Sequence, residues 1–181
     1  MAEASDLERR RRFEDFVEAV YVPRQRYVGR RIHVSSAEDV LGDVLLVLWR
    51  RCDDIPADGT LAWSYAVARR CLANHRRGTQ RRSRLLTRLA ELPVSTGPEC
   101  PDPRLLEALH SLSEGDRELL RLWAWEQLPP REIAVVLDIS PNAASIRLHR
   151  ARGRLRDHLA AGKDRAGGGH LPGQEGTEAS R

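Results

Sequence analysis

Apolar residues recur every three or four positions along almost the whole chain, and this pattern most constrains the fold. Such spacing places them on one face of an α-helix, whereas a half-buried strand alternates apolar and polar residues. We find no convincing alternating stretch in the 181 residues. The sequence therefore predicts an all-α protein.

Two segments interrupt the helical pattern. Residues 52–61, with Pro56 and Gly59, are predicted to form a loop, and a longer segment is rich in proline and glycine. Residues 83–102 include Pro93, Gly97, Pro98 and Pro101 and show no sustained periodicity, which is typical of a linker. We therefore predict two small helical domains, 1–82 and 103–160, joined flexibly. The last stretch, 161–181, is rich in glycine and polar residues and is predicted to be disordered.

Several classes of protein are disfavoured by the sequence. No stretch approaches the roughly 18 uninterrupted apolar residues of a membrane-spanning helix, and the N-terminus lacks the apolar core of a signal peptide. We expect a cytoplasmic protein with no membrane insertion. Cys52, Cys71 and Cys100 form no CxxC pair and are predicted to be reduced thiols. Cys71 and His75 could supply two metal ligands, but two do not close a zinc site, so we predict no metal and no cofactor.

The positive charge of the chain is informative only through its position. The formal net charge is +4 and indicates an anionic partner. Nearly all basic residues are arginines, however, and a GC-rich genome alone produces that bias. The arrangement of the arginines therefore matters more than their number.

Residues 130–155 have the spacing of a helix-turn-helix. Pro130 can occupy the first turn of a short helix, and Ser140 with Pro141 supplies a cap and a first-turn proline for the next one. The inward positions are predicted at Ile133, Ala134, Val136, Leu137, Ile146, Leu148 and Leu155.

The second helix of such a unit lies in the DNA major groove, with its N-terminal residues facing base edges. The alternative is a solvated arginine face on an ordinary packing helix. The capped short helix before it favours the DNA-binding interpretation. The predicted base-facing residues are Pro141, Asn142, Ser145 and Arg147, and the predicted phosphate contacts are Arg150, Arg152 and Arg154.

A second pattern lies on the helix predicted over residues 62–77. Trp63, Arg70, Asn74 and Arg77 share one side of it. An aromatic ring beside guanidinium groups suits single-stranded nucleic acid, because bases stack on the ring while arginines follow the backbone. Trp63 could equally belong to the core.

A third pattern is a strip on the helix predicted from Ala37 to Arg51, opposite its buried face. An acidic strip with an exposed leucine predicts a docking surface for another protein, although a solvated face with one harmless leucine is also common. The strip contains Asp39, Gly42, Asp43, Leu46 and Arg50.

Together these segments resemble the sigma-70 superfamily, specifically the extracytoplasmic-function (group IV) RNA polymerase sigma factors, which keep only domains 2 and 4. "SAEDVLGDVLLVLWRR" resembles the region 2.2 helix, and "AWSYAVARRCLANHRRGTQRR" resembles regions 2.3 and 2.4. "LHSLSEGDRELLRLWAWEQLPPREIAVVLDISPNAASIRLHRARGRLR" resembles region 4. The order and separation of the three matches strengthen each of them.

The resemblance implies a bacterial transcription-initiation factor that binds core RNA polymerase and promoter DNA. Asp39, Asp43 and Trp49 match the family motif that docks on the polymerase. The loop 53–60 and the helix with Trp63 would capture melted DNA at the minus-10 element, and the helix 141–154 would read the minus-35 element. Factors of this family are often held by an anti-sigma factor. The resemblance therefore also implies an anti-sigma factor as a partner.

Departures from the family pattern bear on promoter choice rather than on the fold. Gly42 stands where the family usually has glutamine, and Arg70 and Asn74 replace what are commonly asparagine and aspartate. Ala143, Ala144 and Ser145 stand where threonine, valine and lysine are frequent.

Three rival interpretations remain at the level of sequence. A helix-turn-helix regulator would bind duplex DNA tightly without polymerase. A nucleic-acid-modifying enzyme is disfavoured, because no HExxH, GxxxxGK[ST] or GxSxG is present and the six histidines are scattered. A pure protein-interaction adaptor would leave the arginines unexplained. We therefore expect no enzymatic activity.

Overall fold

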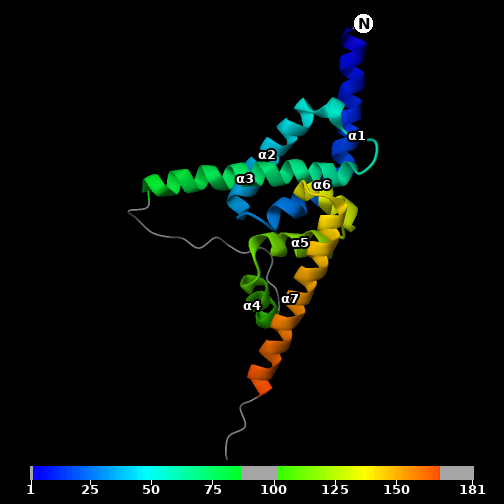
Figure 1. Cartoon of the computed structure of the whole chain (residues 1–181). Helices are drawn as coiled ribbons and strands as arrows, with labels where there is room; N and C mark the ends of the chain where they lie inside the picture. Colours follow the sequence, from blue (N-terminus) through cyan, green and yellow to red (C-terminus); the bar gives the residue numbers. More distant parts are fainter. Residues whose placement is uncertain (1, 87–101, 168–181) are drawn as a thin grey trace, which may run out of the picture.

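The computed structural model describes residues 2–86 and 102–167, which form α-helices, one short 3-10 helix and no strand (Figure 1). This agrees with the predicted all-α class. The elements are α1 (Ala2–Gly29), α2 (Val34–Arg50), η1 (Cys52–Asp54), α3 (Thr60–Leu86), α4 (Pro103–Ser111), α5 (Glu114–Ala124), α6 (Pro130–Leu137) and α7 (Pro141–Gly167).

Helix α3 lies across the middle of the molecule (Figure 1). It contacts α1 and α2 of the first unit, α1–α3, and it also contacts α6 of the second unit, α4–α7. Small buried residues on α3, among them Ala62, Ser64 and Ala68, permit this close approach. The α3 helix is therefore a shared wall between the two units.

The core of the first unit follows the predicted spacing. Val40, Val44 and Leu48 of α2 are buried against Phe16 and Val20 of α1. Phe13 and Val17 are half-buried beside this core. The amphipathic pattern of the sequence is sufficient to fix which faces of α1 and α2 point inward.

The inward face of α7 differs from the predicted one at one position. Ile146 was expected inside, but its side chain is 43% exposed, whereas Ala144, Leu148 and Ala151 are buried. Ile146 lies two residues from both Ala144 and Leu148, which places it on nearly the opposite side of a helix. The small alanines let α7 approach α5 and α6 closely. The prediction assumed that the large apolar residues point inward, and it therefore chose Ile146 instead of the alanines.

The proline at position 23 predicts that the first helix ends before it, but this prediction is wrong, because α1 continues through Pro23 to Gly29. A proline inside a helix removes one hydrogen bond and costs about 3 kcal/mol. Val20 lies before it, and Tyr27 and Val28 lie after it, all buried in the same core. Burial on both sides of Pro23 therefore outweighs the local penalty.

The sequence predicts helix caps at Ser113, which precedes Asp116 by three residues, and at Ser140, and the structure confirms both. The Ser113 hydroxyl accepts a hydrogen bond from the Asp116 N–H at 3.1 Å, and the Ser140 hydroxyl accepts one from the Ala143 N–H at 3.2 Å. The sequence predicts Ser35 or Ser36 as the cap of α2, because serine favours this position, but the helix begins earlier and His33 is its cap. The imidazole Nδ1 accepts from the Ser35 N–H, a role that propensity alone does not assign to histidine.

Helices α3 and α7 continue past residues 82 and 160, where we predicted the two domains to end, and the domain division itself stays a prediction. Helix α3 extends to Leu86 and α7 to Gly167, because Gly78 and Gly162 each cost only about 1 kcal/mol in a helix of otherwise good helix formers. Residues 87–101 and 168–181 lie outside the described part, so the flexible connection and the disordered tail stay predictions. Within the described ranges, no helix is long and apolar enough to cross a bilayer.

The two units pack against each other, whereas two domains joined by a flexible linker were predicted. One continuous apolar cluster includes Tyr65 and Leu72 of the first unit and Leu119 and Ile133 of the second. Helices α3 and α6 form the direct contact. The next section describes the polar groups that accompany it.

Two glycines yield a paired test of the fold. Gly42 lies on the exposed face of α2, and a Cβ at this position would meet no other atom within 4 Å. Gly42→Ala should therefore raise the free energy of unfolding by about 1 kcal/mol, because alanine has the higher helix propensity. Gly59 has φ +72°, so Gly59→Ala should lower it by about 1–2 kcal/mol. Urea unfolding followed by circular dichroism measures both changes. If both variants changed the free energy of unfolding in the same direction, the different roles assigned to Gly42 and Gly59 would be wrong.

Candidate nucleic-acid interface

Helices α6 and α7 form the predicted helix-turn-helix. Asp138 ends α6 in the left-handed conformation at φ 57°, which an aspartate tolerates better than most residues. The Ile139 N–H then donates to the Ala134 carbonyl at 3.1 Å, and the Ser140 cap starts α7. Local chemistry alone therefore accounts for the sharp turn.

The predicted DNA-reading residues at the start of α7 are exposed. Pro141, Asn142, Ser145 and Arg147 all face outward, and the Ser145 hydroxyl donates to the Pro141 carbonyl at 3.0 Å. This bond keeps Ser145 close to its own helix. The guanidinium of Arg147 is the longest polar group among the four.

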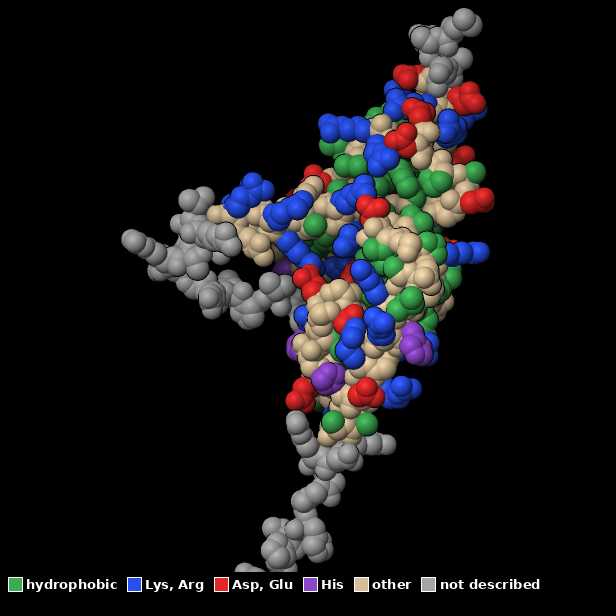
Figure 2. Space-filling view, viewed as in Figure 1, with side chains coloured by type: hydrophobic (Ala, Val, Ile, Leu, Met, Phe, Trp, Pro, Cys, Tyr) green, Lys and Arg blue, Asp and Glu red, His purple; other side chains and the backbone are tan. Residues whose placement is uncertain are grey.

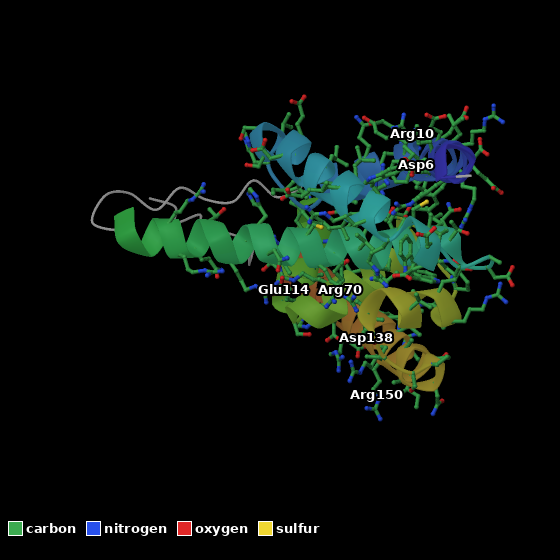
Figure 3. The ribbon with its side chains drawn as sticks, turned by 90° about the horizontal axis from the view of Figure 1, so that it is seen from above. Asp6, Arg10, Arg70, Glu114, Asp138 and Arg150 are labelled. Atoms are coloured by element: carbon green, nitrogen blue, oxygen red, sulfur yellow. The ribbon has the colours of Figure 1, made fainter. Side chains whose placement is uncertain are left out.

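The predicted phosphate contacts of α7 differ in their present partners. Arg154 pairs with Asp116 at 2.7 Å, and the Arg152 guanidinium lies 4.5 Å from the centroid of the Trp123 ring. Arg150 has no ion pair within the described residues and lies at the outer edge, away from α3 (Figure 3). Arg150 is therefore the most available of the three for an external phosphate.

The predicted face of α3 is assembled only in part. Trp63 is half-buried, with Phe16 edge-on at 6.0 Å between ring centroids and the Arg51 guanidinium 5.5 Å away. Trp63 therefore contributes to packing as well as presenting an edge to solvent. Arg70, Asn74 and Arg77 are exposed further along the helix.

Two of these α3 residues have partners within the chain. The Arg77 guanidinium donates to the side-chain carbonyl of Asn74. Arg70 lies 3.7 Å from the carboxylate of Asp138, the residue in the helix-turn-helix turn. Figure 3 shows these two side chains pointing toward one another between the units.

The loop before α3 is held by the N-terminal helix. Arg9 and Arg12 of α1 lie 3.6 and 3.9 Å from Asp53, and the Thr60 hydroxyl donates to the Pro56 carbonyl at 3.3 Å. These contacts hold the start of the loop against α1 and fix the turn between Pro56 and Thr60 at its end. No sequence pattern predicts this contact between the arginine run of residues 9–12 and the loop.

The predicted docking strip on α2 is a continuous exposed face. Asp39, Gly42, Asp43 and Arg50 are exposed, and Leu46 is 47% exposed among them. Trp49 differs from these. Its ring is half-buried, with Phe13 at 5.1 Å between ring centroids and the Arg9 guanidinium at 4.9 Å.

A polar group that the sequence did not reveal joins the two units. We call it the cross-unit network and define it as Tyr27, Arg30, Arg31, Tyr65, Glu118 and Glu126. Arg31 donates to Glu118 and to Glu126, both at 3.1 Å, and Arg30 donates to Glu126 at 3.3 Å. The paired residues lie 61 to 96 positions apart in the sequence, so no local pattern could have identified them.

The tyrosines complete this network. The Tyr27 hydroxyl donates to Glu118 at 3.2 Å, and the Tyr65 hydroxyl donates to Glu126 at 3.5 Å. Burial raises the pKa of both hydroxyls above the usual value of 10, and the adjacent carboxylates raise it further. Both tyrosines therefore stay protonated as hydrogen-bond donors to the carboxylates.

A basic cavity of about 890 Å³ lies between the units. Its walls come from α3, from the start of α5 and from the helix-turn-helix. Figure 2 shows basic side chains along α3 and over the face of the second unit below it. Arginines lining the cavity include Arg69, Arg70, Arg76, Arg77, Arg121 and Arg147.

The cysteines belong to the core where they are described. Cys52 and Cys71 are buried free thiols, as predicted, and burial raises the pKa of the Cys71 thiol, with a further rise from Asp43. The prediction for Cys100 lies outside the described residues. In the described part of the chain, no three potential metal ligands cluster together.

The fold and these surfaces define a helical nucleic-acid-binding protein with a helix-turn-helix. Residues 103–155 match the family described as Sigma-70, region 4. The chain is 32% identical over 159 residues to the RNA polymerase sigma factor CarQ of Myxococcus xanthus, covering 81% of this chain and 88% of that protein. It is 32% identical over 136 residues to the RNA polymerase sigma-E factor of Streptomyces coelicolor, covering 70% and 73% of the two chains.

Solved structures show the same arrangement of helices. The sigma factor RpoE of Bartonella quintana, solved with the anti-sigma factor NepR, superposes with a TM-score of 0.63 at 22% identity, covering 81% of this chain and 98% of that one. CnrH, solved with the cytosolic domain of CnrY, gives 0.56 at 26% identity, covering 82% and 88%.

The chain belongs to the sigma-70 superfamily, as an extracytoplasmic-function RNA polymerase sigma factor. It is thus a transcription-initiation factor that binds core RNA polymerase and directs it to promoter DNA. The predicted family and function are confirmed. The roles of individual residues are addressed below.

The cross-unit network predicts a loss of stability at high pH. Because the pKa values of Tyr27 and Tyr65 are raised in the folded state, unfolding releases protons above pH 10, and the free energy of unfolding should fall there. Each tyrosine lowers the free energy of unfolding by up to about 1.4 kcal/mol per pH unit above pH 10. Urea unfolding at pH 8 and pH 10.5 measures the slope. The Tyr27→Phe/Tyr65→Phe double variant should show a flatter dependence; an unchanged slope would refute the assignment.

Proposed function

We propose that the exposed start of α7 reads the minus-35 promoter element. The observation that carries this proposal is the outward-facing set Pro141, Asn142, Ser145 and Arg147 directly after the capped turn. In helix-turn-helix proteins these positions meet base edges in the major groove. A guanidinium at this place recognises guanine through two hydrogen bonds. The phosphate contacts come from three arginines further along α7, Arg150, Arg152 and Arg154. For this contact, Arg152 must leave the Trp123 ring and Arg154 must leave the Asp116 carboxylate.

We propose that α3 and the loop before it bind the melted minus-10 strand. Arg70, Asn74 and Arg77 are exposed on one side of α3 and follow the phosphate backbone. The half-buried Trp63 presents a ring edge next to the braced loop. Its packing on Phe16 holds the ring in place before DNA arrives, which lowers the entropic cost of stacking.

We propose that the α2 strip docks on core RNA polymerase. Asp39 and Asp43 offer charge for specificity, while Leu46 and the open surface over Gly42 allow close apolar contact. Arg50 lies at the end of the strip. Trp49 supports the strip from beneath through its contacts with Phe13 and Arg9.

Several broader features belong to the same proposal. The two functional domains correspond to residues 1–82 and 103–160, and the protein works in the cytoplasm, without catalytic activity and without a cofactor. RpoE and CnrH were solved with an anti-sigma factor and with the cytosolic domain of CnrY. By analogy, we propose that an anti-sigma factor is a partner of this chain.

Charge reversal on the strip tests the polymerase-docking proposal. Asp43→Arg should weaken binding to core polymerase at least about tenfold, because a like charge replaces a complementary one at the interface. Run-off transcription with core enzyme and a promoter library should fall in parallel. Asp15→Arg, at an exposed position on α1, is the matched control and should retain both. Equal losses in the two variants would show that the strip has no special role.

Substitution of Arg147 tests the minus-35 proposal. Arg147→Ala should reduce discrimination for promoters with the cognate upstream element by about 1–3 kcal/mol if Arg147 reads a base. Transcription from promoter variants with a changed upstream element measures this loss. A uniform loss on every template would instead identify Arg147 as a phosphate contact. Arg156→Ala, which removes an exposed arginine further along α7, is the control.

A further inference from the structure

Ile146 occupies the centre of the exposed face at the start of α7. Successive residues of an α-helix are rotated by about 100° around its axis, so Ile146 lies about 160° from both Ala144 and Leu148. These two residues are buried in the second unit, whereas the Ile146 side chain is 43% exposed. The side chain of Ile146 therefore projects away from the core.

The fold gives this side chain no packing role. In the part of the chain that the structure describes, Leu137 and Ile139 of the helix-turn-helix pack against the core, and Ile146 is not among the residues that do so. Its neighbours on the same side of α7 are polar instead. Asn142 lies four residues before it and Arg150 four residues after it, and both are exposed. Ile146 is thus an apolar side chain at the centre of a polar, outward-facing surface.

The face around Ile146 points away from the first unit. Figure 3 shows Arg150 at the outer edge of the molecule, away from α3. Ile146 lies about one helical turn before Arg150 on the same side of α7. Arg147 lines the cavity between the units, and Ile146 is not among the residues of its wall. An incoming molecule can therefore reach Ile146 from the outer side of α7.

The chemistry of isoleucine restricts what this position can recognise on DNA. Its side chain neither donates nor accepts a hydrogen bond. In the major groove, base edges present donors, acceptors and one methyl group, the C5 methyl of thymine. A polar base edge placed against Ile146 would lose its hydrogen bonds to water and gain none in return. An isoleucine here therefore favours thymine and disfavours the other three bases.

The surroundings of Ile146 suit such a contact. A β-branched side chain keeps almost a single χ1 rotamer in a helix, so little conformational entropy is lost when it meets a base. Asn142 is of the residue type that recognises adenine through two hydrogen bonds, and Arg150 carries the charge for a phosphate contact. These polar contacts hold α7 in the groove, and the apolar side chain between them meets the floor of the groove.

We propose that Ile146 reads a thymine of the minus-35 element through apolar contact with the C5 methyl group of that base. This inference rests on the proposed minus-35 role of α7 and specifies one base that the helix selects. It assigns a function to a residue that the helical spacing placed in the core. Removal of the methyl group alone, with every hydrogen-bonding group of the base retained, is then sufficient to weaken the complex.

Deoxyuridine, which is thymidine without the C5 methyl group, tests the contact directly. The full chain with core polymerase selects a promoter from a library, and each thymine of its minus-35 element, on either strand, is replaced in turn by deoxyuridine. One replacement should weaken promoter binding about fourfold, because the burial of one methyl group is lost. Fluorescence anisotropy of a fluorescein-labelled promoter duplex, with the modified duplexes as competitors, measures the change.

Substitution of Ile146 assigns the methyl contact to this residue. Ile146→Ala should bind the thymine and deoxyuridine promoters equally. Val135→Ala is the matched control, because Val135 is also apolar and is 50% exposed but lies on α6. It should keep the fourfold difference and bind the unmodified promoter within about twofold of the unsubstituted chain. Circular dichroism checks the fold of both variants, and lower salt brings a weakly binding variant into the measurable range by strengthening its phosphate contacts.

The outcomes separate this inference from the proposed function. If no single deoxyuridine weakens binding, or if the fourfold difference persists in Ile146→Ala, Ile146 does not read a thymine methyl group and the inference is wrong. A promoter with a scrambled minus-35 element then decides about the helix itself. Weaker binding of the scrambled promoter to the unsubstituted chain with core polymerase keeps the minus-35 role of α7, whereas unchanged binding removes that role as well.

Discussion

The carboxylate of Glu126 is the interaction on which the arrangement of the two units depends. It accepts hydrogen bonds from Arg30, Arg31 and Tyr65 and is almost completely shielded from water. Removal of any one donor leaves part of a buried charge uncompensated, which costs several kcal/mol. The cavity with Arg147 in its wall and the Arg70–Asp138 pair lie at the same interface between the units.

Local rules predicted most of the fold. The caps at Ser113 and Ser140, the buried faces of α2 and α6, and the helix-turn-helix all follow from residues within a few positions of one another. The exposed sets on α2 and α7 follow from the same periodicity. Features determined by short-range spacing can be derived from the sequence, because each residue there competes only with its neighbours.

The remaining features depend on contacts between distant segments. Pro23 is tolerated inside α1 because residues on both sides of it pack into one core, and Ile146 is exposed because small alanines give α7 a closer approach. Trp63 and Trp49 both rest on phenylalanines of α1. The pairing of Arg31 with Glu118 and Glu126 has no counterpart in local pattern, so sequence spacing alone could not predict that the units meet.

Helix α7 is continuous over 27 residues, a length of about 40 Å. A rigid rod of this length converts a small tilt into a large displacement at its ends. If α7 turned by about 10° around its midpoint, its first residues would move by about 3.5 Å, which is close to the 3.4 Å rise of one base pair. A tilt imposed at the far end of α7 therefore displaces its first residues by a distance comparable to one base-pair step.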